Sequence, residues 1–152
     1  MTKILFICHG NICRSTMAEY VMKHLVREAG LEDTFYIDSA ATSTEEIGSP
    51  VHYGTRRTLE REGIYCGGHR ARQMTRGDYE TFDLLIGMDS ANLRNMRRIC
   101  GGDEAGKLHL LLDYTGQRRD IADPWYTGNF FVTFQDVMAG CRALLEACTA
   151  GK

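Results

Sequence analysis

The sequence predicts an α/β protein with a parallel sheet, and three observations lead to that fold class. Short apolar runs typical of buried strands alternate along the chain with longer segments whose apolar residues recur at helical spacing. Such alternation favours parallel strands joined by crossover helices. Polar loops with reactive side chains follow the first and fourth predicted strands, at residues 8–15 and around residue 123. Because ligands bind beyond the carboxyl ends of parallel strands, both loops are expected at the same edge of the sheet.

The N-terminal segment predicts a buried strand, a tight loop and a helix in direct succession. The strand is the apolar run at residues 4–7, and the loop is Cys-His-Gly-Asn-Ile-Cys-Arg-Ser at residues 8–15. The helix that follows carries, at helical spacing, Met17, Ala18, Val21, Met22 and Leu25. A loop that ends at a helix start gathers unpaired backbone N–H groups and the positive end of the helix dipole, so it suits an anion.

Individual residues of this loop strengthen the prediction of an anion site. Gly10 can adopt positive φ and Asn11 tolerates it, so the backbone amides can curl inward. Arg14 adds a planar guanidinium that matches two oxygens of a phosphate. Cys8 stands at the loop entrance, where a positive field favours the reactive thiolate. Together these residues predict a phosphate-binding cradle with a nucleophile at its base.

Simpler interpretations of the same residues stay open. Taken alone, Cys8 could be a small buried hydrophobic residue at a strand end, and Arg14 a solvated residue of the first helical turn. A metal or redox pair of Cys8 and Cys13 is conceivable, although the spacing is not Cys-x-x-Cys and no second Cys/His pair follows at a suitable spacing. The joint context of strand, cysteine, glycine, arginine, serine and helix favours the cradle.

The segment after the first helix predicts a second strand and a second helix. Gly30 is typical of a helix end, and residues 34–39 alternate as a strand does. Residues 40–51 predict a loop because they are rich in Ser, Thr and Gly. Residues 52–63 predict a helix that ends at Gly63.

The second half of the chain continues the alternation. Residues 82–88 predict a third, mostly buried strand, and Asp89 or Ser90 can cap the helix that follows. One face of that helix carries Leu93, Met96 and Ile99. Residues 107–112 predict the fourth strand. A last helix is predicted from the apolar stripe of Phe130, Phe134, Val137, Met138, Cys141, Leu144, Leu145 and Cys148.

Composition and charge fit one globular domain spanning residues 1–152. The chain is 43% hydrophobic and 25% charged, which is enough for a real core. A net charge of −2 gives no reason to expect nucleic acid or a membrane as a partner. The N-terminal apolar run is too short for a signal peptide or a membrane span. Six cysteines are too sparse for a disulfide scaffold, so a reducing, cytoplasmic location is expected, while the oligomeric state is not predicted.

Residues 8–15 resemble the Cys-x5-Arg-Ser/Thr loop of the low-molecular-weight protein tyrosine phosphatases. Asp123-Pro124-Trp125-Tyr126 resembles the general-acid loop of the same family, and the likeness extends from about Lys3 to the last helix. The resemblance implies a four-stranded parallel doubly wound sheet with helices on both faces and the phosphate-binding loop after the first strand. It also implies an enzyme that hydrolyses phosphotyrosine-type aryl phosphates through a phosphocysteine intermediate, with no metal or other cofactor.

The resemblance assigns a role to each residue of the two loops. Cys8 would be the nucleophile, Arg14 would hold phosphate oxygens, and Asp123 would protonate the leaving oxygen and then activate water. Ser15 would hydrogen-bond the cysteine sulfur and ease its departure from phosphorus. The other expected substrate-binding residues are His9, Gly10, Asn11, Ile12, Cys13, Trp125 and Tyr126.

A polar network supports the cradle in this family, and its members map onto Asn11, Ser15, Ser39 and His69. Each assignment has a simpler alternative. A lone histidine such as His69 is more often an ordinary loop residue, and Ser15 could be a plain helix cap. Asp123 could belong to a simple Asp-Pro turn, and the two aromatic residues that follow it could merely pack the loop onto the domain.

Glu45 departs from the family pattern. The family often carries an aromatic residue at this position of the Ser-Thr-x-Glu-Ile-Gly stretch, here residues 43–48. Half of an aromatic sandwich around the substrate ring is therefore expected to be missing, which affects fine specificity and leaves the chemistry intact. His9 is expected to face the mouth of the site and partly offset the charge of Glu45.

Other activities are compatible with the same scaffold. A phosphoarginine phosphatase is the first alternative, and a thiol-coupled arsenate reductase is weaker because Cys66 and Cys100 lie far apart in the sequence. A phosphate-binding module without turnover, or a redox sensor based on Cys8 and Cys13, belongs to a different functional class. The resemblance implies threonine in phosphoarginine phosphatases where this chain has Ile12. Phosphotyrosine proteins or peptides are therefore the expected substrates, with inorganic phosphate and vanadate as inhibitors.

Overall fold

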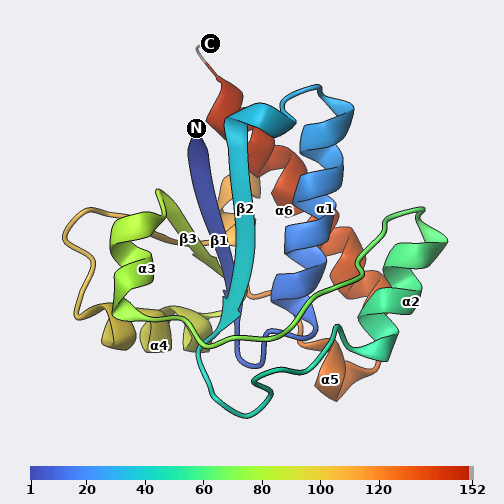
Figure 1. Ribbon diagram of the computed structural model, residues 1–152, viewed down its shortest axis with the longest axis horizontal. Helices are drawn as coiled ribbons and strands as arrows, with labels where there is room; N and C mark the ends of the chain where they lie inside the picture. The colour runs from blue at the N-terminus through green and yellow to red at the C-terminus, as the bar shows by residue number, and fades with distance from the viewer. Residues whose placement is uncertain (151–152) are drawn as a thin grey trace.

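Four parallel strands form one sheet in the order β2-β1-β3-β4, with helices on both faces (Figure 1). The computed structural model describes residues 1–150, so the last two residues of the predicted domain lie outside the described part. The strands are β1 (Thr2–Cys8), β2 (Phe35–Ala41), β3 (Leu84–Gly87) and β4 (Leu108–Leu110). The helices are α1 (Arg14–Glu28), α2 (Tyr53–Arg61), α3 (Arg76–Thr81), α4 (Ser90–Cys100), α5 (Pro124–Thr127) and α6 (Phe130–Thr149), with 3₁₀ turns η1 (Glu32–Thr34) and η2 (Leu111–Thr115). The expected four-stranded parallel α/β sheet is confirmed.

Strand β1 occupies a central place in the sheet because both of its faces are apolar. Ile4 and Phe6 pack into a core shared with α1 and α6, whereas Leu5 and Ile7 pack on the opposite face with α4. Successive side chains of a strand point to opposite faces, so a strand buried on both needs a continuous apolar run. The N-terminal run that predicted β1 therefore organises both halves of the core.

The strand order reverses beside β1, and this reversal positions the candidate site. The chain leaves β1 through α1 to reach β2 on one side, and it later returns to β3 on the other side of β1. The loops that leave β1 and β3 thus diverge at their carboxyl ends and open a crevice. In Figure 1 the loop after β1, helix α4 and helix α5 all lie at the lower end of the sheet.

Most predicted elements are confirmed with end shifts of a few residues. Gly30 and Gly63 follow α1 and α2 with φ of 71° and 73°, which is the left-handed conformation expected of glycine at a helix end. Asp89 is the N-cap of α4, and its side chain accepts a hydrogen bond from Asn92 N–H. The last helix, α6, buries the stripe residues nearest its middle, including Val137.

The predicted fourth strand at residues 107–112 is wrong in its second half. β4 ends at Leu110, and the chain then turns into η2. Leu111 and Leu112 are both buried in the core beneath α6, so their side chains do not alternate across the sheet. Helices α3 and α5 were not predicted because six and four residues are too few to establish a helical period.

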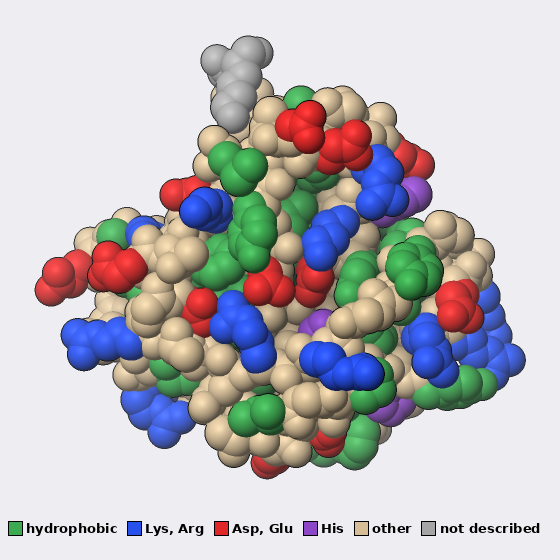
Figure 2. Space-filling view, in the orientation of Figure 1, with side chains coloured by type: hydrophobic (Ala, Val, Ile, Leu, Met, Phe, Trp, Pro, Cys, Tyr) green, Lys and Arg blue, Asp and Glu red, His purple; other side chains and the backbone are tan. Residues whose placement is uncertain are grey.

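Charges of both signs are interspersed on the face shown in Figure 2. Lys and Arg gather most visibly over α2, which carries Arg56, Arg57 and Arg61. Among the helices of residues 1–150, none combines the length and the apolar character needed to cross a membrane.

Replacing Gly140 with alanine is expected to destabilise the protein. Gly140 is buried in α6, and a Cβ added there would lie 2.5 Å from Cγ of Leu111, which is itself fully buried and cannot move aside. Overpacking of this kind typically costs about 1–3 kcal/mol, more than the helix propensity gained by alanine. Urea denaturation followed by circular dichroism measures the change in the free energy of unfolding.

Gly77→Ala is the matched control for this prediction. Gly77 also lies in a helix, α3, but a Cβ there would meet only Thr75 Oγ1 at 3.6 Å, an ordinary contact. Alanine at residue 77 is expected to be neutral or stabilising by up to about 1 kcal/mol. Equal free energies of unfolding for Gly140→Ala and the unchanged protein would contradict the tight packing of α6 on η2.

Candidate active site

The loop between β1 and α1 is a cradle of free backbone amides. Among the described residues, no acceptor takes the N–H groups of residues 9–13. Asn11 has a φ of 60° and is the only non-glycine residue in 1–150 with positive φ. Gly10, which was expected to share this conformation, does not adopt it, so the reversal that curls the loop occurs at Asn11 alone. Free N–H groups on a curled loop before a helix form a site for an anion.

Three hydrogen bonds stabilise Asn11 in this costly conformation. Its side-chain Nδ2 donates to Ser15 Oγ at 2.9 Å, and its Oδ1 accepts from the backbone N–H of Arg72 at 3.2 Å. Its carbonyl oxygen lies 2.8 Å from Nε2 of His69. His69 therefore contacts the cradle as expected. The Ser39 hydroxyl instead donates to the buried carboxylate of Glu19, and no hydrogen bond between the Ser39 side chain and residues 8–15 is found in the described part.

Cys8 lies at the base of the cradle with Ser15 beside it. The Cys8 sulfur is 3.1 Å from Ser15 Oγ, and both residues are buried. Because Asn11 Nδ2 already donates to Ser15 Oγ, the serine hydroxyl hydrogen is free to point at the sulfur. Ser15 is the second residue of α1 and makes no capping bond, so its alternative interpretation as a helix cap is wrong.

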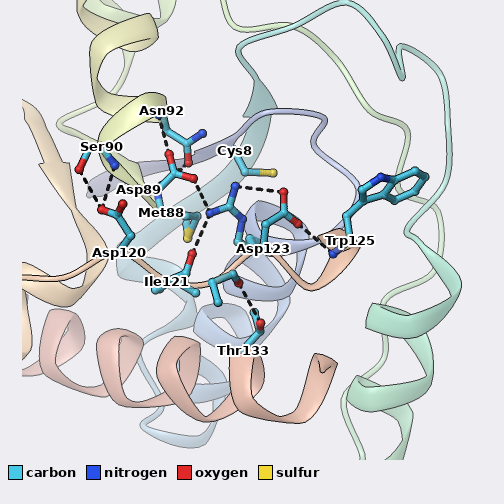
Figure 3. Close-up of polar contacts among 12 residues, drawn as sticks. Cys8, Met88, Asp89, Ser90, Asn92, Asp120, Ile121, Asp123, Trp125 and Thr133 are labelled. Carbon is cyan, nitrogen blue, oxygen red and sulfur yellow. Dashed lines mark hydrogen bonds and ion pairs between the residues drawn. The ribbon is translucent and has the colours of Figure 1, made fainter. Parts of the chain in front are cut away.

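Arg14 joins the cradle to two later segments of the chain (Figure 3). Its Nη1 donates to Asp89 Oδ2 at 2.7 Å and to the carbonyl of Ile121 at 2.9 Å. Its Nη2 lies 3.4 Å from Asp123 Oδ2. Burial by itself would lower the pKa of Arg14, but the negative charges of Cys8, Asp89 and Asp123 outweigh it and raise the pKa above its usual value. The guanidinium is therefore charged and fixed in orientation.

Asp123 faces both the cradle and its own helix. It is the N-cap of α5, where its Oδ1 accepts the N–H of Trp125 at 3.0 Å and Pro124 occupies the first helical position. Its other oxygen, Oδ2, points toward Arg14. The Asp-Pro turn and the contact with Arg14 thus occur together, and the side chain keeps 24% of its surface exposed.

A single pocket brings most of the predicted site residues together. Asn11 and Ser15 are fully buried behind the cradle, and Ser39 and His69 lie outside the pocket. The pocket is lined by Cys8, His9, Gly10, Ile12, Cys13, Arg14, Glu45, Glu46, Asp123, Trp125 and Tyr126.

The two sides of the pocket mouth differ in chemistry. Trp125 and Tyr126 are 58% and 84% exposed and form an aromatic side. His52, which the sequence did not indicate as a site residue, packs its ring edge-on against Trp125 at a centroid distance of 5.5 Å. On the other side Glu45 Oε2 lies 2.8 Å from His9 Nε2, the pairing expected from the sequence. The pocket lining therefore combines aromatic and acidic side chains.

Cys13 shares the pocket with Cys8 but differs from it in environment. Burial raises the pKa of the Cys13 thiol to about 12, and the nearby charges of Cys8 and Asp123 add to the effect. The thiol of Cys13 is therefore neutral at physiological pH. Both cysteines are free in the structure.

Several residues that hold the site were not predicted from the sequence. Asp89 was considered only as a helix cap, yet its second carboxylate oxygen binds Arg14. The signal for it was available, because Asp89 follows β3 at the same sheet edge as Cys8. Arg72, Asp120 and Thr133 carried no such signal, since each acts through a backbone contact with a distant segment.

Comparisons with known proteins agree over nearly the whole chain. The family model described as low molecular weight phosphotyrosine protein phosphatase matches residues 3–151. The low molecular weight protein-tyrosine-phosphatase YfkJ of Bacillus subtilis is 42% identical over 149 residues, which cover 97% of this chain and 96% of that protein. The low molecular weight phosphotyrosine protein phosphatase of Rattus norvegicus is 41% identical, with 94% and 93% covered.

Solved structures show the same similarity in three dimensions. The crystal structure of YfkJ from Bacillus subtilis matches with a TM-score of 0.96 at 40% identity, covering 100% of this chain and 97% of that one. The crystal structure of DARP, a Drosophila arginine phosphatase, matches with a TM-score of 0.90 at 27% identity, covering 99% and 100%.

Proposed function

This chain belongs to the low molecular weight phosphotyrosine protein phosphatase family and is a cysteine-based phosphoric monoester hydrolase, and we propose that it dephosphorylates phosphotyrosine side chains. In this proposal Cys8 is the nucleophile, and Asp123 is the general acid and then the general base. The observation that carries the proposal is the convergence of the Cys8 sulfur, the free loop amides, Arg14 and Asp123 on one pocket. Each group has the chemistry that its step requires.

In the first step the Cys8 thiolate attacks phosphorus in line with the leaving oxygen. A sulfur–phosphorus bond forms, the bond from phosphorus to the phenolic oxygen breaks, and Asp123 gives its proton to that oxygen. The loop amides and the guanidinium of Arg14 stabilise the negative charge on the equatorial oxygens. The hydroxyl of Ser15 lies 3.1 Å from the sulfur and can donate to it once Cys8 is a thiolate, which lowers the cost of carrying charge there.

In the second step water removes the phosphoryl group from sulfur. Asp123, now ionised, accepts a proton from the attacking water, and the sulfur leaves as a thiolate. Because the water replaces the departed phenol, one carboxylate serves both steps from one position. Inorganic phosphate is the product, and phosphate and vanadate are expected to inhibit by occupying the same cradle.

A direct assay tests this mechanism as a whole. Turnover of p-nitrophenyl phosphate should persist in excess chelator and be lost when the thiol is alkylated with iodoacetate, with inorganic phosphate protecting against alkylation. Turnover abolished by the chelator would overturn the thiolate mechanism. Phosphate binding without any turnover would indicate a binding module instead. A free nucleophilic thiol also favours a reducing compartment such as the cytoplasm as the place of action.

A phosphoarginine side chain is the second candidate substrate. Glu45 and Glu46 line the pocket mouth and would attract a cationic guanidinium, and one similar structure is an arginine phosphatase. Ile12 argues against it, because this side chain is 9% exposed and offers only apolar surface to the pocket. Guanidinium N–H groups that face it without an acceptor would each cost about 1–3 kcal/mol.

Phosphotyrosine peptides are therefore expected to have a much higher kcat/KM than matched phosphoarginine or phosphoserine peptides. A phenyl ring leaves no donor unpaired against Ile12 and can stack on the exposed aromatic side of the pocket. Ile12→Thr should narrow the gap with phosphoarginine by restoring a hydroxyl, whereas Ile12→Val, which stays apolar, should not. Equal kcat/KM for phosphoarginine and phosphotyrosine peptides in the unchanged protein would contradict the substrate assignment and leave the Cys8 mechanism standing.

A further inference from the structure

Asp123 has few contacts that could fix its position. Its side chain accepts one bond from Trp125 N–H, inside its own turn, and lies 3.4 Å from Arg14 Nη2, at the long end for a hydrogen bond. About a quarter of the side chain is exposed. The place of the carboxyl group is therefore set by the backbone on both sides of it. After Asp123, the N–H groups of Tyr126 and Thr127 bond its carbonyl oxygen within α5, and before it lie residues 120–122.

Helix α6 holds the residue immediately before the acid. Thr133 Oγ1 donates to the carbonyl oxygen of Ala122 at 3.0 Å (Figure 3). Thr133 is 1% exposed, so solvent cannot hydrogen-bond its hydroxyl. The bond to Ala122 therefore fixes the orientation of the Thr133 side chain. Ala122 itself is exposed, which means that the loop carbonyl could be solvated if the threonine hydroxyl were absent.

Helix α4 holds the other end of the same segment. One carboxylate oxygen of Asp120 accepts both the backbone N–H of Ser90 at 3.0 Å and the Ser90 hydroxyl at 2.9 Å (Figure 3). Ser90 is the first residue of α4, and the preceding residue is Asp89, which binds Arg14. The beginning of α4 thus holds the phosphate-binding guanidinium and the acid loop at once.

Between these two tethers the backbone is fixed at Ile121. Its N–H donates to the Met88 carbonyl at 2.9 Å, and its carbonyl accepts from Arg14 Nη1. Residues 120, 121 and 122 are therefore each bonded to a different element, and Asp123 is the first residue beyond them. We call residues 120–122 the bridge, because a side chain holds each of its ends: Asp120 at one end and Thr133 at the other.

We propose that Thr133 and Asp120 are positioning residues for general-acid catalysis, because the bridge they hold aims the Asp123 carboxyl at the leaving oxygen. The proposal rests on the proposed function of Asp123. Proton transfer requires the donor within hydrogen-bond reach of the leaving oxygen, and small displacements reduce the rate strongly. Binding of the phosphate group depends on the cradle and Arg14, which neither side chain touches.

The test is a set of kcat/KM values for aryl phosphates that span poor to good leaving groups, measured with Thr133→Val. Valine keeps the shape of threonine and removes only the hydroxyl. We expect kcat/KM for phenyl phosphate to fall by roughly 5- to 30-fold, a fraction of the full general-acid contribution, while p-nitrophenyl phosphate changes by less than about 2-fold. The dissociation constant of inorganic phosphate should be unchanged, and Thr133→Ser should restore the leaving-group dependence.

Thr58→Val is the matched control for this variant. Thr58 is a buried threonine of α2 whose hydroxyl also donates to a backbone carbonyl, that of Gly54 at 2.8 Å. It lies outside the residues that line the pocket and should leave the leaving-group dependence as it is. An equal change in Thr58→Val would show that any buried threonine has this effect and would overturn the proposal.

A double-mutant cycle with Asp123→Asn separates positioning from general destabilisation. Asparagine cannot donate the proton, so its position no longer affects general-acid catalysis. Thr133→Val should therefore cause no further loss of kcat/KM for phenyl phosphate in the Asp123→Asn background. A loss of the same factor in both backgrounds would contradict the proposal. Asp120→Ala, at an exposed residue that should not prevent folding, must show the same selective loss and the same absence of effect in Asp123→Asn.

The outcomes distinguish this inference from the proposed function. If Asp123→Asn abolishes the leaving-group response but neither Asp120→Ala nor Thr133→Val alters it, the bridge is not a positioning device and the catalytic role of Asp123 stands. If Asp123→Asn lowers kcat/KM equally for good and poor leaving groups, the proposed role of Asp123 fails first, and the positioning proposal fails with it.

Discussion

Cys8→Ser is expected to eliminate turnover of p-nitrophenyl phosphate while phosphate and vanadate still bind. A serine hydroxyl is a weak nucleophile without a general base, and the side chain hydrogen-bonded to residue 8 is the hydroxyl of Ser15, which is not a base, so a loss on the order of 10⁴-fold or more is expected. The free N–H groups and Arg14, which hold the anion in the proposed mechanism, are untouched by the substitution. Steady-state kinetics measure the first effect and isothermal calorimetry with phosphate the second.

Cys148→Ser is the matched control for this substitution. Cys148 lies half-buried near the end of α6, outside the pocket lining, and its serine variant should retain activity. Activity that survives in Cys8→Ser would rule out Cys8 as the nucleophile. Loss of phosphate binding in the same variant would show that the sulfur is part of the ground-state anion site, which the geometry of free amides does not predict.

Asp123→Asn is expected to lower kcat/KM for phenyl phosphate far more than for p-nitrophenyl phosphate. Asparagine keeps an oxygen that can accept the Trp125 N–H, so the turn before α5 is preserved and only the proton is removed. Phenol is a poor leaving group and needs that proton, and general-acid assistance typically contributes about 10²–10⁴-fold. The nitrophenolate leaves with little help, so its kcat/KM should change much less.

Asp136→Asn provides the control for the loss of a carboxylate. Asp136 forms a two-bond ion pair with Arg119, close in sequence to the loop of Asp123, and within residues 1–150 no hydrogen bond or ion pair joins it to Asp123. Both substrates should keep their kcat/KM in this variant. An equal loss on the two substrates in Asp123→Asn would mean that the carboxylate acts only as a cap for α5.

The sequence determined the cradle because its parts are contiguous. An apolar run, a cysteine, an arginine and an amphipathic helix within residues 4–25 specify a strand, a loop and a helix by local rules, and the loop chemistry follows from the helix start. The ends of α1 and α2 also follow from local sequence, because the glycines Gly30 and Gly63 just after them adopt the positive φ that ends a helix. The pairing of Asp123 with the cradle was also predictable, because loops after parallel strands meet at one sheet edge.

Tertiary structure decided which side chains hold these groups in place. Arg14 is fixed by Asp89, 75 residues away, and Asn11 by a backbone N–H 61 residues away, and these partners follow from strand order and the packing of loops. The bond from Thr133 to Ala122 likewise joins two segments that only the fold brings together. The burial of Leu111 beneath α6 is also a tertiary effect, and it is why the predicted fourth strand ends early. Local periodicity specifies which face of an element is apolar, but a hydrogen bond between distant segments depends on register and packing that only the folded chain defines.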